Sequence, residues 1–282
     1  MRWQRARRSD NVVDARGRGL RTAGGLGLGG VVIIIALSLL TGQDPLVMLD
    51  QFGGTSQVTS EAGAPPADDR EAEFVRAILG DTEDTWHALF TEAGETYRDP
   101  TLVLFRGSVQ SACGLASAAA GPFYCPADQQ VYLDLSFFAE MATRFAAAGD
   151  FAQAYVIAHE VGHHVQTLLG VTQQVQLARQ RGERLEGAGG LLVRQELQAD
   201  CLAGVWAHHA QQRHQWLEAG DQEAALQAAS AIGDDRLQQA SRGTVVPDAF
   251  THGTSAQRER WFRTGFETGD TATCHTFAAA NL

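Results

Sequence analysis

The stretch "IAHEVGHHVQ", residues 157–166, decides how the rest of the chain is interpreted. It predicts a helix on which His159 and His163, four residues apart, project from one face. Two imidazoles at that spacing suit one tetrahedral metal ion. Glu160, directly after the first histidine, could reach a water molecule at that metal. The alternative is an ordinary helix with histidines on its surface. The pattern therefore predicts a zinc site whose remaining ligand lies elsewhere in the chain.

A catalytic zinc site needs three protein ligands and one open position for water. A metzincin would carry Gly at position 166 and His at 169, but the chain has Gln166 and Leu169, so that class is excluded. Further on, "RQELQADCLAGVWA" (194–207) places Glu196 and Asp200 four residues apart on a second predicted helix, with small residues that allow close approach. We expect Glu196 to complete the site and Asp200 to accept the free N–H of a ligand histidine. The alternative is a solvated helix face.

The other histidines have simpler interpretations. We expect His164 to point away from the metal and to pack or support the site. His208, His209 and His214 lie in the polar stretch "AHHAQQRH" and are expected on the surface, although one of them could replace the glutamate ligand. His252 lies in a Gly/Thr/Ser turn before a helix. It could stabilise an oxyanion or simply be a structural turn residue.

The remaining patterns predict an α+β fold that is mainly helical. Short strands are expected at 101–105 and 130–135, with a helix over 136–148 capped by Ser136. The other predicted helices span 70–79, 83–93, 151–169 (ended by Gly170), 191–217, 221–231, 234–240 and 255–268.

Charge is unevenly distributed along the 282 residues, whose formal net charge is −11. Residues 1–21 hold seven arginines and two aspartates, so the rest of the chain holds 15 basic and 31 acidic side chains, a balance of −16. A domain this acidic would be repelled by a phosphate backbone. No nucleic-acid partner is expected.

An apolar segment, "GGLGLGGVVIIIALSLL" (24–40), follows the arginines and is just long enough to span a bilayer as a helix. The positive-inside rule then predicts a basic cytoplasmic N-terminus (1–23) and a transmembrane signal anchor (24–41). A Gly-, Ser-, Thr- and Pro-containing linker (42–68) and an extracytoplasmic domain (69–282) would follow. A cleaved signal peptide and a buried core helix are the alternatives.

The four cysteines include no C-x-x-C pair, which argues against a thiolate zinc site. An even number in an oxidising compartment suggests two disulfides, for which three pairings exist. We prefer Cys113–Cys125, which closes a short loop, and Cys201–Cys274, which ties the C-terminal tail to the domain. Free buried thiols are the alternative.

The chain resembles the neutral zinc metallopeptidase family, a group of membrane-anchored bacterial H-E-x-x-H proteins. The resemblance covers nearly the whole chain outside the linker. One departure is "TCHTF" (273–277), which lacks an acidic residue after the cysteine. The matching stretches are "MRW", "RRSDNVVDARG", "GQDP", "CGLASAAAGPFYCPADQQVYLDLSFF", "AYVIAHEVGHHVQ", "RQELQADCLAGVWA", "AIGDDRLQ" and "HGTSAQRERWF".

The resemblance implies a zincin-like metallopeptidase domain that acts on a peptide or protein. With the ligands His159, His163 and Glu196, the arrangement is gluzincin-like and holds one catalytic Zn²⁺, although cobalt or manganese would also fit. Glu160 would take a proton from a water molecule that the zinc acidifies, and His252 would help to hold the oxyanion.

By analogy with zincins, an extended substrate would pair with "QVYLDL" (130–135) or with the loop between Cys113 and Cys125. Two other functions remain open at this point. They are a membrane-tethered zinc-binding protein without turnover, and a metal-dependent amidase acting on a non-protein substrate. The oligomeric state is not predicted.

Overall fold

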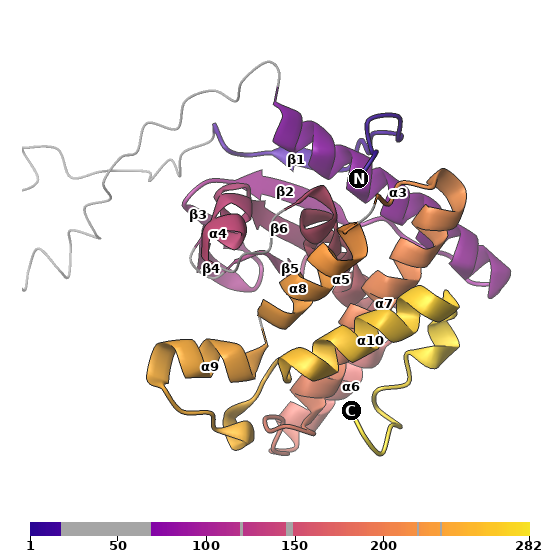
Figure 1. The fold of residues 1–282 in the computed structure, drawn as a ribbon. Helices are drawn as coiled ribbons and strands as arrows, with labels where there is room; N and C mark the ends of the chain where they lie inside the picture. The colour runs from indigo at the N-terminus through magenta and orange to yellow at the C-terminus, as the bar shows by residue number, and fades with distance from the viewer. Residues whose placement is uncertain (18–68, 119–120, 145–148, 219, 232) are drawn as a thin grey trace, which may run out of the picture. The chain divides into compact units, whose positions relative to one another are not determined.

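A computed structural model describes residues 1–17, 69–118, 121–144, 149–218, 220–231 and 233–282. The fold is α+β and mainly helical with small sheets, as the sequence predicts (Figure 1). Residues Met1–Ala15 and Pro66–Leu282 form one compact unit.

The main sheet has four strands in the order β1 (Val12–Asp14), β2 (Thr101–Phe105), β6 (Gln130–Asp134), β5 (Phe123–Cys125). The first three are mutually parallel, and β5 runs antiparallel to β6. Alternate residues of β2 and β6 face opposite sides, one toward the main core and the other toward a smaller cluster. A separate hairpin consists of β3 (Ser108–Ser111) and β4 (Gly114–Ser117).

Helix α5 (Asp150–Leu168) lies at the centre of the helical part and contacts helices and strands alike. The others are α3 (Arg70–Glu92), α4 (Ser136–Arg144), α6 (Val171–Gln180), α7 (Leu191–His214), α8 (Asp221–Ala231), α9 (Asp234–Arg242) and α10 (Ser255–Thr268), with 3-10 turns at Pro247–Ala249 and Thr271–Thr273. Helix α7 contacts α5 on one side and α10 on another.

Small residues allow α7 to approach both neighbours. A Cβ added to Gly162 of α5 would lie 3.0 Å from the carbonyl oxygen of Ala199. A Cβ on Gly265 of α10 would overlap the carbonyl oxygen of Cys201. The side chains that α5 and α7 carry are therefore brought close together, which is the basis of the site described below.

The N-terminal residues are part of this fold. Trp3 is buried and contacts Phe74 edge to face with ring centroids 5.3 Å apart, while its indole N–H donates to Asp150 (2.8 Å). Strand β1 pairs with β2 a few residues later. Arg7 forms an ion pair with Glu83 (2.7 Å), a carboxylate that is itself buried.

The predicted membrane topology is therefore wrong. Residues before and after the apolar segment belong to one folded unit, so the N-terminus and the domain cannot lie on opposite sides of a bilayer. Among the described residues, no helix is long and apolar enough to cross a membrane. The expected anchor (24–41) and linker (42–68) lie outside the described residues.

Several predicted elements are also corrected. The two helices expected at 70–79 and 83–93 are one helix, α3. Gly80, which suggests a break, faces the N-terminal segment, where an added Cβ would lie 2.9 Å from the carbonyl oxygen of Arg7. Ser136 is the first residue of α4 rather than its N-cap, and its own N–H donates to the carboxylate of Asp134 (3.0 Å).

Both disulfides are present with the preferred pairing. Cys113–Cys125 joins the loop of the β3–β4 hairpin to β5, and Cys201–Cys274 joins α7 to the C-terminal tail. The described cysteines include no free thiol.

Candidate metal centre

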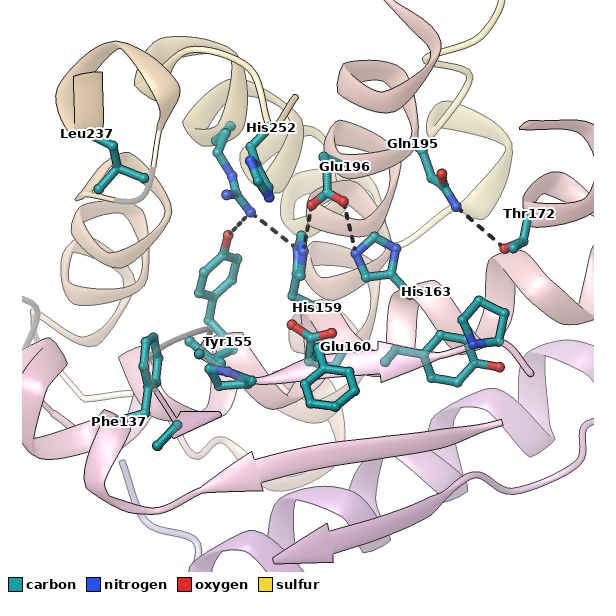
Figure 2. Close-up of a pocket in the computed structure, with 18 of the residues that line it drawn as sticks. Phe137, Tyr155, His159, Glu160, His163, Thr172, Gln195, Glu196, Leu237 and His252 are labelled. Carbon is teal, nitrogen blue, oxygen red and sulfur yellow. Dashed lines mark hydrogen bonds and ion pairs between the residues drawn. The ribbon is translucent and has the colours of Figure 1, made fainter. Parts of the chain in front are cut away.

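Three side chains from two helices meet in one pocket. His159 and His163 come from α5 and Glu196 from α7, as Figure 2 shows. His159 Nε2 lies 3.2 Å from one Glu196 oxygen, and His163 Nε2 lies 3.4 Å from the other. Ligands of a tetrahedral ion with bonds of 2.0–2.1 Å stand about 3.3 Å apart. The spacing of these three residues therefore fits one zinc ion.

The outer nitrogens of both histidines are also bonded. His159 Nδ1 lies 2.8 Å from Asp200, and His163 Nδ1 lies 2.9 Å from the side-chain oxygen of Gln166. A carboxylate can only accept, so His159 Nδ1 carries the hydrogen and its Nε2 is directed toward Glu196. This orientation is the one a metal-binding histidine needs.

Asp200 belongs to a fully buried network. It accepts a hydrogen bond from the Tyr155 hydroxyl (2.6 Å) and two from the guanidinium of Arg258 (2.8 and 2.9 Å). Burial raises the pKa of Asp200, but Arg258 and His159 outweigh burial and lower it. The carboxylate therefore stays charged at neutral pH without being an unpaired buried charge.

The acidic neighbours of the two histidines favour the protonated form of each ring. Burial lowers the pKa of His159, but Asp200 and Glu196 outweigh burial and raise it to about 10. Burial also lowers the pKa of His163, which Glu196 raises above its usual value. Burial raises the pKa of Glu196, yet the two histidines hold it well below its usual range. Because a metal binds neutral imidazole, metal binding here is coupled to proton release.

Glu160 lies beside the ring of His159 and lines the same pocket, a cavity of about 600 Å³ (Figure 2). Its carboxylate is not part of the three-residue cluster. One wall of that cavity is strand β5, which contributes Phe123 and Tyr124. In the described sheet β5 is at the edge, whereas "QVYLDL" (β6) lies between β2 and β5. The sequence suggests two segments that could pair with an extended substrate, "QVYLDL" and the loop between Cys113 and Cys125. Of these two, only the loop, through β5, has an edge in the described sheet with which a substrate could pair.

His252 lies in Figure 2 above the cluster, beside Glu196, and lines the same pocket. Its side chain is 49% exposed, and its Nδ1 lies 2.8 Å from the Thr251 hydroxyl and 3.4 Å from Asp234. Asp234 also accepts the backbone N–H of His252 (2.6 Å) and of both residues beside it. This carboxylate therefore fixes the loop that carries His252.

Three further histidines on α7 take no part in the cluster. His208 and His209 bond the backbone carbonyls of Phe266 and Gly269, and His214 bonds Asp81. They tie α7 to its surroundings, so none of them replaces Glu196.

His164 is fully buried and supports the pocket wall. Its Nε2–H donates to the carbonyl of Arg98 (2.6 Å), so its Nδ1 can accept from the Tyr124 hydroxyl (3.1 Å). Burial lowers its pKa and keeps the ring neutral. His164 thus connects α5 to the edge strand β5.

Four residues that support the site, Tyr155, Arg258, Gln166 and Asp234, are not among those predicted from the sequence. Spacing offers a signal for two of them, because Gln166 lies one helical turn after His163 and Tyr155 one turn before His159. Arg258 and Asp234 stand in matched stretches, "HGTSAQRERWF" and "AIGDDRLQ", but nothing in those letters says which side chain they contact.

An α+β fold with a His-His-Glu cluster suited to one metal ion defines the class of this protein. The chain matches the family described as "Putative neutral zinc metallopeptidase" over residues 1–277, and it belongs to that family. "Uncharacterized protein YpfJ" of Escherichia coli (strain K12) is 50% identical over 288 residues, covering 98% of this chain and 99% of the relative. "Uncharacterized protein Rv2575" of Mycobacterium tuberculosis (strain ATCC 25618 / H37Rv) is 45% identical over 219 residues, covering 74% of this chain and 73% of the relative. No solved structure matches the chain.

Proposed function

We propose that the protein hydrolyses peptide bonds with one zinc ion held by His159, His163 and Glu196. The observation that carries this proposal is the convergence of the two Nε2 atoms on the Glu196 carboxylate, with each Nδ1 supported from behind. A bound zinc ion would supply a Lewis acid that acidifies water and polarises a carbonyl group.

The chain's own residues divide the remaining work. Glu160 takes a proton from the attacking water and later gives it to the leaving amine. His252, held by Asp234, lines the pocket and donates a hydrogen bond from its second ring nitrogen to the oxyanion. Asp200, held by Arg258, keeps His159 in the orientation that zinc requires.

The substrate would lie extended along β5. This strand is an edge of the described sheet and lines the cavity, so its backbone groups are available to pair with a peptide. A set of three protein ligands with the Glu160 carboxylate in the same pocket favours turnover over a purely structural zinc site, which is usually closed by four protein ligands. We therefore favour a peptidase over a zinc-binding protein without turnover.

The test is hydrolysis of a mixed peptide pool by the full chain loaded with zinc, beside Glu160→Gln at equal zinc content. Loss of a general base costs about 10²- to 10⁴-fold in rate, so we expect cleavage by the parent and at least a hundredfold less by the variant. Equal rates would remove Glu160 from the mechanism. Zinc binding without cleavage by either protein would favour a binding protein or an amidase acting on a non-protein substrate.

A further inference from the structure

Gln166 links the second histidine of the metal cluster to α7. Its side chain is fully buried, and its amide nitrogen donates to the carbonyl of Gln195 (2.7 Å) and to the side-chain oxygen of Gln198 (3.0 Å). A backbone carbonyl can only accept, so this network assigns the amide's orientation and turns its oxygen toward His163. His163 Nδ1 must then donate, which leaves its Nε2 for a metal.

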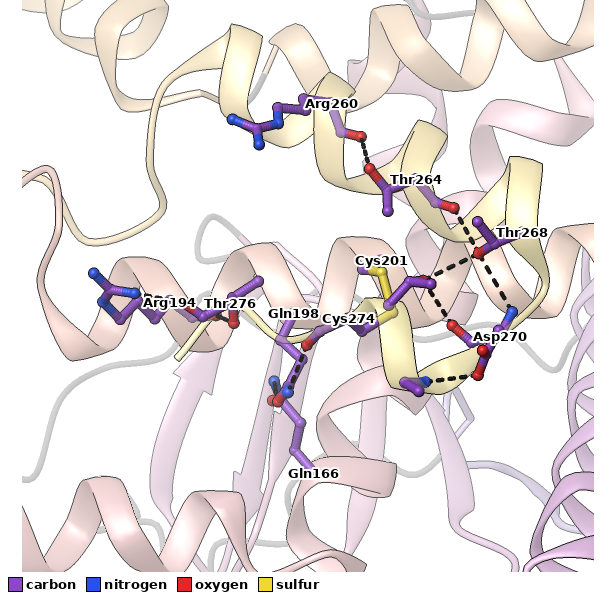
Figure 3. Close-up of a disulfide and its surroundings, with 12 residues drawn as sticks. Gln166, Arg194, Gln198, Cys201, Arg260, Thr264, Thr268, Asp270, Cys274 and Thr276 are labelled. Carbon is purple, nitrogen blue, oxygen red and sulfur yellow. Dashed lines mark hydrogen bonds between the residues drawn. A yellow bond between two sulfur atoms is a disulfide. The ribbon is translucent and has the colours of Figure 1, made fainter. Parts of the chain in front are cut away.

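Gln198 continues the connection to the C-terminal tail. Its amide nitrogen donates to the backbone carbonyl of Cys274 (3.0 Å), which again assigns the amide and directs the oxygen to Gln166. Cys274 is bonded to Cys201 of α7, and both cysteines are buried. An unbroken chain of hydrogen bonds therefore runs from His163 to the disulfide, and Figure 3 shows its part from Gln166 onward.

The tail is attached along one face of α7. Arg194, Gln198 and Cys201 are four and three residues apart, the spacing of one helix face, and all three contact the tail. The Arg194 guanidinium donates to the carbonyls of Thr276 and Ala279, and the Thr276 hydroxyl donates back to the carbonyl of Arg194 (2.6 Å). Glu196 and Asp200 lie on the neighbouring face, toward the pocket. Helix α7 is thus held between the tail and the metal cluster.

We propose that the disulfide-tethered C-terminal tail positions His163 for metal binding through Gln198 and Gln166. Breaking the relay at Gln198 leaves the carbonyl of Gln195 as the remaining acceptor for the buried amide of Gln166. The amide oxygen is then held less firmly against His163. His159 has a separate support in Asp200, so the effect falls on one ligand of the three. The proposal rests on the metal site of the proposed function.

The variant Gln198→Met removes the relay with little change in volume. Supports behind a metal-binding histidine contribute about 10- to 100-fold to metal affinity, so we expect the zinc dissociation constant of the full chain to rise by that factor. It is measured by competition with a chromogenic chelator. Gln195→Met is the matched control, because that side chain bonds Thr172 (3.5 Å) and lies outside the relay. Its zinc affinity should equal that of the parent.

A second pair of measurements separates positioning from folding. The double variant Cys201→Ala/Cys274→Ala should also bind zinc more weakly than the parent. Adding Gln198→Met to it should lower the zinc affinity little further, because the disulfide and Gln198 act through the same path. Melting of the zinc-free proteins reports any general loss of stability. If Gln198→Met does not fold, Gln166→Met takes its place under the same comparison.

The outcomes are distinguishable. If the parent binds zinc and a folded Gln198→Met binds it with equal affinity, the relay is wrong but the metal site is retained. Fully additive losses from the relay and disulfide variants would also overturn it. A parent that binds no zinc removes the metal site and this proposal together.

Discussion

At the scale of single residues, Asp234 controls the one histidine that reaches over the pocket. Its hydrogen bond is the main cause that raises the pKa of His252, with burial acting in the opposite direction. A raised pKa means that the ring stays charged, with Nε2–H ready to donate, up to a higher pH than an ordinary histidine of about 6.5. The donor is then lost as the pH rises through the raised value.

Asp234→Asn should therefore move the alkaline limb of the kcat/KM profile to lower pH. The amide oxygen can still accept the loop's backbone N–H groups, so the loop keeps its anchor while the charge is lost. Asp235→Asn is the control, because Asp235 bonds Ser255 rather than His252. The comparison is made on the peptide that the parent cleaves best. If the pH profiles of kcat/KM for the parent and Asp234→Asn superimpose, protonation of His252 plays no part in the reaction.

Sequence patterns at this scale predict the ligands and one support, Asp200, but not the residues that hold Asp200 and His252 in place. His159, Glu160 and His163 share one short helical stretch, so periodicity alone predicts that they lie together. Asp200 on α7 contacts Arg258 on α10, a residue 58 positions further along the chain. No local spacing encodes such a contact, because it depends on how α10 crosses α7. The same reason hides Asp234, which lies 18 residues from His252.

At the scale of elements, the site depends on helices that approach closely. Gly265 lets α10 lie against α7, and an alanine there would overlap the carbonyl oxygen of Cys201, next to Asp200. Gly265→Ala should destabilise the protein by about 1–3 kcal/mol through overpacking. Urea unfolding measures this loss as a lower midpoint.

Gly189→Ala is the matched control for that substitution. No atom lies within 4 Å of the position its Cβ would take, so the change should be neutral or stabilising by about 0.4–1 kcal/mol. Equal midpoints for both alanine variants would mean that α10 and α7 can separate without cost.

Short strands were the elements that the sequence predicted least well. Strands β1 and β5 have three residues each, too few to show an alternating pattern. The partner of β1 lies far along the chain, and β5 is tied by its Cys125 to Cys113, so tertiary context decides their conformation. The long helices α5 and α7 were predictable because their patterns extend over several turns.

At the scale of the whole molecule, the arginine-rich N-terminus was misinterpreted for a physical reason. The positive-inside rule weighs basic residues near an apolar segment and takes no account of intramolecular partners. Here Arg7 pairs with Glu83 and Asp84, and Arg8 pairs with Glu73, all three on α3. The basic N-terminus and the acidic domain are complementary parts of one fold.

Removing the contacts of the N-terminal segment should therefore destabilise the domain itself. Trp3→Ala deletes a buried indole that packs on Phe74 and donates to Asp150, and loss of a buried tryptophan costs about 3–5 kcal/mol. Arg5→Ala changes an exposed side chain in the same segment, and its free energy of unfolding should stay within about 0.5 kcal/mol of the parent.

Deleting residues 1–14 removes Trp3, the partners of the buried Glu83 carboxylate and β1 together, so it should destabilise the protein more than Trp3→Ala. Urea unfolding of the four proteins, without added zinc, measures these differences as shifts in midpoint. A truncated chain as stable as the parent would show that the domain folds without its N-terminal residues and would contradict the single folded unit described here.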